Sequence, residues 1–238
     1  MKQVFSILLI LILCNCSLWS QKQKVQNQPY GDHKLYHFGI SIGMNFQDIL
    51  LTNAGIPAET GETTETWFAT IPDYSPGFSA GLLADLYLNP YMNLRFSPML
   101  HFGDKVFEFV KQEDRSQRYR AVIRSNYLTA PLDLKIRSMR LNNYRPYIIA
   151  GTYLSMDLGR KTNEAVYLKP LDYGLTIGLG CDFYLPIIKV IPELRFSFGL
   201  ADIITHDRKD LTDNSLWKYS DAIAKGKTRM ISLVFNFE

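Results

Sequence analysis

Alternation between apolar and polar residues runs through most of the chain. In the stretch YHFGISIGMNF, residues 36–46, every even position is apolar or aromatic, and every odd position between them is small or polar. A period of two is the signature of a β-strand with two unlike faces. The pattern continues in seven further segments: residues 76–88, 92–103, 127–137, 146–158, 171–185, 190–200 and 229–238. The sequence therefore predicts eight strands.

The length of these strands separates two classes of all-β protein. Strands of soluble proteins usually have ~5–6 residues, whereas a tilted strand that crosses a bilayer needs ~9–11, which all eight segments supply. The mean hydropathy of −0.08 does not oppose this reading, because only alternate residues of such a strand face lipid. We therefore predict an all-β fold, an eight-stranded antiparallel up-and-down transmembrane β-barrel.

The connections between the predicted strands alternate in length. Long connections lie at residues 48–76, 104–120, 159–169 and 202–228, and short ones at residues 89–90, 138–145 and 186–188. An outer-membrane barrel shows this alternation, with long extracellular loops and short periplasmic turns. Part of residues 104–120 is expected to extend its two strands as a hairpin above the membrane. Because eight is an even number, both termini are expected on the periplasmic side.

The N-terminus predicts a secretory signal peptide at residues 1–20. Lys2 gives it a positive start, residues 4–13 form an apolar core too short to span a membrane, and Ser20 is a small residue before the cleavage point. A lipoprotein signal at Cys14 or Cys16 is the alternative. We expect residues 21–34 to be a short periplasmic segment and residues 35–238 to form the barrel.

Charge and cysteine content exclude some partners. Loss of Lys2 with the signal leaves 25 of the 26 basic residues against 23 acidic ones, and this small excess implies no nucleic-acid partner. Only Cys181 remains in the mature chain, so no intrachain disulfide is possible.

If the apolar faces contact lipid, the polar faces line the lumen. Glycines on those faces make room for large charged side chains, and an unpaired charge away from water is costly. We therefore expect an ion-pair network inside a lumen that is only about wide enough for side chains. Its predicted members are Asp85, Arg95, His101, Asp133, Lys135, Arg137, Asp157, Asp172, Asp182, Glu193 and Arg195. The alternative is that some of these charges bind a ligand or conduct protons.

Candidates for catalysis or cofactor binding are weak. A lipid-modifying enzyme would need a base and a nucleophile at the lipid-facing rim, and the outward positions hold no histidine and few hydroxyls. No cysteine and histidine cluster has zinc spacing, and no glycine run precedes a helix. We expect no catalytic residue, metal, cofactor or small-molecule substrate, with a loop-borne catalytic site as the alternative.

The last long connection contains a possible helix. Asp213 or Asn214 is suited to cap a helix over residues 215–224 that ends near Gly226. Such a helix would either dock on a partner or fold back onto the rim of the barrel. Its candidate contact residues are Leu216, Trp217, Tyr219 and Ile223.

Several stretches resemble known outer-membrane proteins. YLTAPLDLKIR and YRPYIIAGTYLS are similar to a pattern in many small barrels of Bacteroidota. More specifically, LDYGLTIGLGCDFYLP, IPELRFSFGL, HDRKDLTD and TRMISLVFNFE resemble the PorT-like barrels of the type IX secretion system, which exports proteins with a C-terminal sorting domain. A departure is Glu238, because such barrels normally end on an aromatic residue.

The resemblance implies a non-enzymatic accessory or assembly component of type IX secretion, whose partners would be outer-membrane lipid and other secretion components. One rival is a stand-alone barrel that supports the envelope or binds extracellular ligands through its loops. The other is a soluble barrel with an apolar interior. In that case Phe38, Leu132, Ile177 and Phe235 would lie in a core, with Arg95 or Asp182 in bulk water.

Overall fold

The computed structural model describes residues 27–54, 58–60, 63–65, 67–70, 75–111, 118–159, 167–205 and 222–238. The predicted signal peptide lies outside these residues. A short 3-10 helix, Gly31–His33, precedes the first strand. The strands are β1 (Tyr36–Asn53), β2 (Ala58–Thr60), β3 (Thr63–Glu65), β4 (Trp67–Thr70), β5 (Ser75–Asn89), β6 (Met92–Phe96), β7 (Met99–Lys111), β8 (Arg118–Arg137), β9 (Tyr144–Asp157), β10 (Leu171–Tyr184), β11 (Lys189–Gly199) and β12 (Ile223–Phe237).

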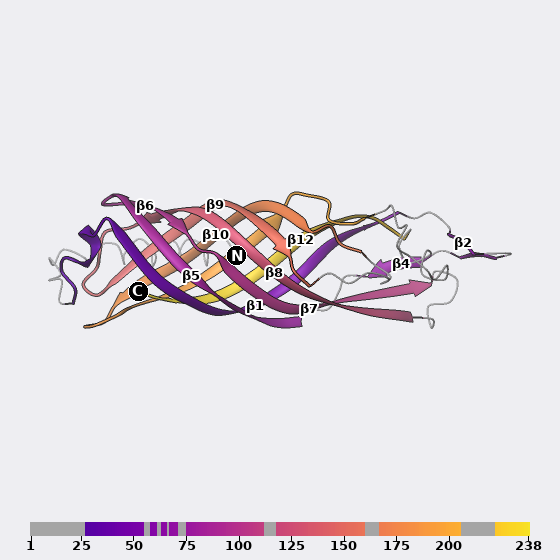
Figure 1. The fold of residues 1–238 in the computed structure, drawn as a ribbon, viewed down its shortest axis with the longest axis horizontal. Coiled ribbons are helices and arrows are strands. Elements are labelled where there is room, and N and C mark those ends of the chain that lie inside the picture. Colours follow the sequence, from indigo (N-terminus) through magenta and orange to yellow (C-terminus); the bar gives the residue numbers. More distant parts are fainter. Residues whose placement is uncertain are drawn as a thin grey trace, which may run out of the picture.

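The long strands close into a barrel (Figure 1). β1 pairs antiparallel with β5 on one side and β12 on the other, and from β8 to β12 each strand pairs with the next. β6 and β7 share one place in the wall, because both pair with β5 and β8. The ring therefore has eight positions, and the predicted eight-stranded antiparallel barrel is confirmed. Among the described residues, no helix is long and apolar enough to cross a membrane.

The third predicted strand, residues 92–103, is divided between β6 and β7. Ser97 and Pro98 interrupt it, and proline has no N–H to donate to a neighbouring strand. The Pro98 carbonyl still accepts a hydrogen bond of 3.0 Å from the Leu82 N–H on β5. The wall is therefore continuous across the break.

Several strands extend past their predicted ends on the side of the long connections. β7 and β8 form the expected hairpin, which reaches beyond the rest of the barrel in Figure 1. β4 pairs with β7 in this extension, and β2 pairs with β3. The period of two missed these short strands because they lie within a polar, threonine-rich connection.

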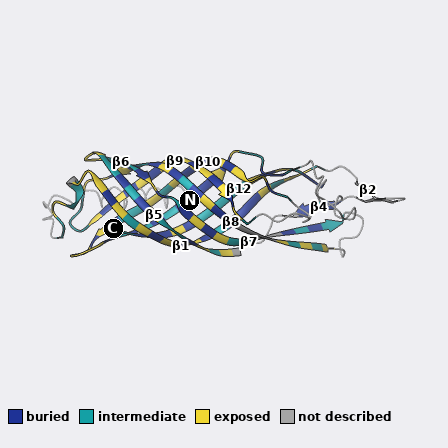
Figure 2. Cartoon of the chain, viewed as in Figure 1, coloured by how far each residue is buried: buried dark blue, intermediate teal, exposed yellow. Residues whose placement is uncertain are grey.

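Exposure alternates along each wall strand (Figure 2). Phe38 is 73% exposed, Leu132 48% and Ile177 50%, whereas Arg95 and Asp182 are fully buried. The rival prediction of a soluble barrel with an apolar interior is therefore wrong. A contiguous belt of aliphatic and aromatic side chains is unfavourable in water, at about 25 cal/mol per Å², and is suited to hydrocarbon.

Two inward glycines make room for aromatic side chains on the neighbouring strand. Gly174 pairs with Tyr153, and Gly180 pairs with Tyr147, all within the β9–β10 ladder. A Cβ atom at Gly174 would lie 2.7 Å from Tyr153 Cε1, and one at Gly180 would lie 2.5 Å from Tyr147 Cζ. The rings therefore cover the glycine backbone, which brings both phenol groups into the lumen.

The exposed belt predicts the effect of a charge on the outer face. Ile177→Arg, in the middle of β10, should lower the free energy of unfolding in lipid vesicles by about 2–4 kcal/mol, because arginine at the bilayer midplane is costly. Val122→Arg is the matched control, since Val122 is 56% exposed on the β8 extension and should cost about 0–1 kcal/mol. Urea titration measures both, and equal losses would contradict the belt.

Candidate functional site

The centre of the lumen is organised around Arg95 on β6. Asp85 lies directly opposite on β5. Its carboxylate accepts two hydrogen bonds from the guanidinium, of 2.7 Å from Nε and 2.8 Å from Nη2. The third nitrogen, Nη1, donates to Glu193 Oε2 of β11 at 2.5 Å. All three side chains are buried, so one arginine links two walls of the barrel through charge-assisted hydrogen bonds.

Glu193 extends this arrangement to further strands. The Tyr147 hydroxyl on β9 donates to Glu193 Oε2 at 2.5 Å, and Arg195 Nε donates to Glu193 Oε1. Arg195 also lies 3.3 Å from the Asp133 carboxylate on β8 and donates to Ser97 Oγ at 2.9 Å. A buried carboxylate with several donors is stabilised by a polarised hydrogen-bond network.

Lys135 on β8 carries the network to β10. Its ammonium donates to both carboxylate oxygens of Asp182, at 2.7 and 2.9 Å. It lies 3.9 Å from Asp85 Oδ2 and 4.1 Å from the centre of the Tyr147 ring. Seven of the eleven predicted residues therefore belong to one central network: Asp85, Arg95, Asp133, Lys135, Asp182, Glu193 and Arg195.

The short-turn end of the lumen is closed by the N-terminal segment. Asp32, in the 3-10 helix, accepts a hydrogen bond of 2.6 Å from the Tyr184 hydroxyl. Its carboxylate also lies 3.8 Å from Arg137, 3.6 Å from Arg140 and 3.4 Å from Arg145. Figure 1 shows this segment, in indigo, across the left-hand end of the barrel. Of these residues only Arg137 was predicted, because Asp32 precedes the first alternating segment.

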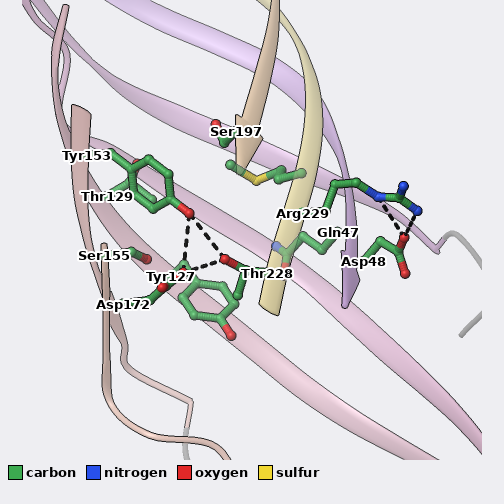
Figure 3. A pocket seen from close by; sticks show the side chains of 11 residues that line it. Gln47, Asp48, Tyr127, Thr129, Tyr153, Ser155, Asp172, Ser197, Thr228 and Arg229 are labelled. Carbon is green, nitrogen blue, oxygen red and sulfur yellow. Dashed lines mark hydrogen bonds and ion pairs between the residues drawn. The ribbon is translucent and has the colours of Figure 1, made fainter. Parts of the chain in front are cut away.

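Between the charged network and the side of the long connections, the lumen contains a cavity lined mainly by polar side chains (Figure 3). Asp172 on β10 accepts hydrogen bonds from the Tyr153 hydroxyl, at 3.2 Å, and from Thr228 Oγ1. The lining also includes further hydroxyl side chains, such as Thr129 and Ser155, together with Gln47, Met230 and the Asp48–Arg229 ion pair. The space open to the centre of a water molecule is about 30 Å³, and a buried water needs ≳10–15 Å³.

The two remaining predicted members lie near this cavity and outside the charged centre. His101 sits between two hydroxyl groups, with its ring nitrogens 2.8 Å from Ser79 Oγ and 3.0 Å from Thr129 Oγ1. Asp157, at the end of β9, accepts a hydrogen bond of 2.9 Å from the Gly159 N–H. Each of these side chains therefore makes at least one hydrogen bond to an uncharged group.

Beyond the cavity the interior becomes apolar. A buried cluster fills the barrel extension and joins β1, β4, β7 and β12: Ile49, Trp67, Ala69, Phe107, Phe109, Leu168, Ile203, Ile204, Ala222 and Ile223. The inward face of β1 shows the change, because Gln47 is followed two residues later by Ile49. The period of two locates the inward face, but it does not say where that face changes from polar to apolar.

One member of this cluster corrects a prediction. Ile223 was expected on a helix face that either docks on a partner or folds back onto the rim, but it is the first residue of β12 and only 1% exposed. Ala224 also lies in β12, so a helix over residues 215–224 is wrong at its end. The other candidate contact residues, Leu216, Trp217 and Tyr219, lie outside the described residues.

The described lumen is therefore filled in four layers: the Asp32 cluster, the charged network, the polar cavity and the apolar cluster. Within the described ranges, no group of three or more histidine, cysteine, aspartate or glutamate side chains is placed to hold a metal ion. The chemistry of these layers is that of a packed interior, in which charges are paired with one another.

Comparison with protein families gives one match. The model of the family described as the outer membrane protein beta-barrel domain matches residues 19–205 of the 238-residue chain. No curated protein matches the chain.

Several solved structures of outer-membrane proteins align with most of this chain. OprG from Pseudomonas aeruginosa has 12% identity and a TM-score of 0.44, over 84% of this chain and 92% of that chain. Neisserial surface protein A has 10% identity and a TM-score of 0.41, over 85% and 98%. Ail of Yersinia pestis has 12% identity and a TM-score of 0.34, over 84% and 96%. At such low identities and TM-scores, none of them carries an argument about function.

The central network predicts unequal effects for two arginine substitutions. Arg95→Met should lower the free energy of unfolding by about 3–5 kcal/mol, because it leaves Asp85 and Glu193 buried without their shared cation. Arg118→Met is the matched control, since Arg118 pairs with Glu108 at 3.1 Å in an exposed position and should cost less than about 1 kcal/mol. Urea titration in vesicles compares the two, and a small Arg95 effect would contradict the role given to the network.

Proposed function

Because this chain belongs to the outer membrane protein beta-barrel domain family, we propose that it is an integral outer-membrane component that acts through contacts with other proteins. The observation that carries this proposal is the filled lumen, in which Arg95, Lys135 and Arg195 are paired with buried carboxylates. Such an interior favours neither a diffusion pore nor a catalytic site. The surfaces left for function are the outer wall, the long connections and the short-turn rim.

In this proposal the long connections are extracellular, and both termini lie on the periplasmic side. Long loops outside and short turns inside are the usual orientation of such barrels. Contacts with soluble periplasmic proteins would then use the short-turn rim, and contacts within the membrane would use the wall.

We further propose that the partners belong to the type IX secretion system. The stretches that resemble the PorT-like barrels include residues 171–186, 191–200 and 228–238, which fall on β10, β11 and β12. These strands are neighbours in the ring, so the resemblance is concentrated in one sector of the wall. Its outer face carries exposed apolar side chains: Leu175, Ile177, Leu179, Phe198, Leu233 and Phe235. We propose that this sector contacts another membrane component of the secretion apparatus.

A pair of phenylalanines tests this proposal by site-specific cross-linking. Phe198 on β11 is 42% exposed and Phe96 on β6 is 44% exposed, and the order of the ring puts these strands on opposite sides of the barrel. A photoreactive amino acid at position 198 should cross-link to a secretion component in native membranes, whereas one at position 96 should react mainly with lipid. Deletion of the gene should abolish secretion of cargo with the sorting domain.

Normal secretion after deletion would overturn the specific role. Cross-links of equal yield from both positions would overturn the assignment of the contact to β10–β12, while leaving a role in secretion intact. The two parts of the proposal are therefore tested separately.

A stand-alone barrel that binds extracellular ligands is the second candidate. The observation that favours it is the β7–β8 hairpin, which extends past the ring and exposes Arg118 and Arg120 on its outer face. This candidate predicts unchanged secretion, with altered adhesion or envelope permeability, in the same deletion strain.

A further inference from the structure

A notch interrupts the barrel wall at its short-turn end. The β1–β12 ladder begins with Ile40 opposite Phe237, where β12 ends. β1 itself begins four residues earlier, at Tyr36, so Tyr36 to Phe38 extend past the end of β12. The next wall strand on that side is β11, which begins at Lys189. A cavity of about 220 Å³ lies here, larger than the cavity near Asp172.

The outer side of the notch is apolar. Tyr36 is 59% exposed, Phe38 73%, and Ile187, in the turn between β10 and β11, 91%. All three line the cavity, and the two aromatic residues continue the outward face of β1. The outer side therefore has the character of the surface that meets acyl chains at the edge of the hydrocarbon region.

The inner side of the notch is polar and contains two lysines, Lys34 and Lys189. Lys189 donates to both carboxylate oxygens of Glu238, at 2.9 and 2.8 Å, so these two charges offset one another. Lys34 is exposed, and the described residues place no carboxylate within ion-pair distance of its ammonium group. Lys34 is therefore a cation of the lining that no side-chain carboxylate of the described residues offsets.

His37 helps to fix this inner side. Its Nε2 lies 2.8 Å from the Gly31 carbonyl oxygen. A carbonyl can only accept a hydrogen bond, so the hydrogen is on Nε2. This bond holds the chain before Lys34 against β1 and places the lysine at the cavity.

We propose that the notch binds the phosphate of a glycerophospholipid, with the phosphodiester at Lys34 and the acyl chains along Phe38 and Ile187. The joint presence of a cation and a lipid-facing apolar wall favours an amphiphile over a free anion. The volume is below the ~300–1,000 Å³ of sites that enclose a whole small molecule, so the site takes the headgroup and leaves the chains in the bilayer. This proposal does not depend on a role in secretion.

Native mass spectrometry of the full mature chain in detergent tests the site, with dioleoylphosphatidylglycerol as the probe. The protein should retain one phosphatidylglycerol at low lipid concentration. Lys34→Ala should weaken this binding about fivefold, from the contribution of one lysine near a phosphate surface, and Lys34→Arg should retain it. Lys225→Ala is the matched control, because Lys225 is also exposed but lies on the far end of β12.

Two further measurements separate the lipid from other ligands. Dioleoylglycerol, which lacks the phosphate, should not be retained, and inorganic phosphate should not displace the phospholipid. Ile187→Ser should weaken retention while the heat-dependent shift in gel mobility shows a folded barrel. Equal retention by wild type and Lys34→Ala, equal binding of dioleoylglycerol, or displacement by millimolar phosphate would each overturn the proposal.

Discussion

The high cost of placing a charge or an unpaired peptide group in hydrocarbon is the constraint on which this structure depends. Closure of the β1–β12 ladder pairs the last wall strand with the first. The charges are then turned inward, where Arg95 and Glu193 meet across the lumen at 2.5 Å. The apolar side chains that a soluble protein would bury lie on the outside instead.

The same constraint explains why the interior is layered. In the part of the wall with an apolar outer face, the inward side chains are charged and paired, as for Lys135 and Asp182. In the extension, where Arg118 and Arg120 are exposed outside, the inward side chains are apolar, as for Phe107 and Phe109. The extension therefore resembles a soluble β-protein, with charged side chains outside and apolar side chains inside, and it continues the wall of the membrane barrel.

Most of the wall could be predicted from the sequence because its signal is local. A period of two depends only on neighbouring residues, and it assigned the inward face of Arg95, Asp133 and Asp182 before any pairing was known. The pairing itself could not be predicted, since Arg95 and Glu193 are 98 positions apart. Tyr147 was not among the residues predicted to line the lumen, although it lies on the same face of β9 as Tyr153.

The missed and wrong predictions lie in segments where apolar and polar residues do not alternate regularly. Asp32 lies in a short helix before β1, and nothing near it in the sequence indicates its three arginine neighbours. Ile223 fitted a helical spacing in a polar connection, yet it starts the last strand and packs in the apolar cluster of the extension. Contacts with residues far away in the sequence determine where Asp32 and Ile223 lie. Such contacts produce no periodic pattern of apolar and polar residues.

The contacts of residues 27–35 at the short-turn end of the barrel have a consequence for biogenesis. Asn27 hydrogen-bonds to Asn143, 116 positions later, and Asp32 depends on Tyr184, 152 positions later. In chain order, residues 27–35 thus precede the whole wall, whereas their partner Tyr184 ends the sixth of its eight positions. If the wall forms in chain order, the short-turn end stays open until β10 is in place, and residues 27–35 then close it.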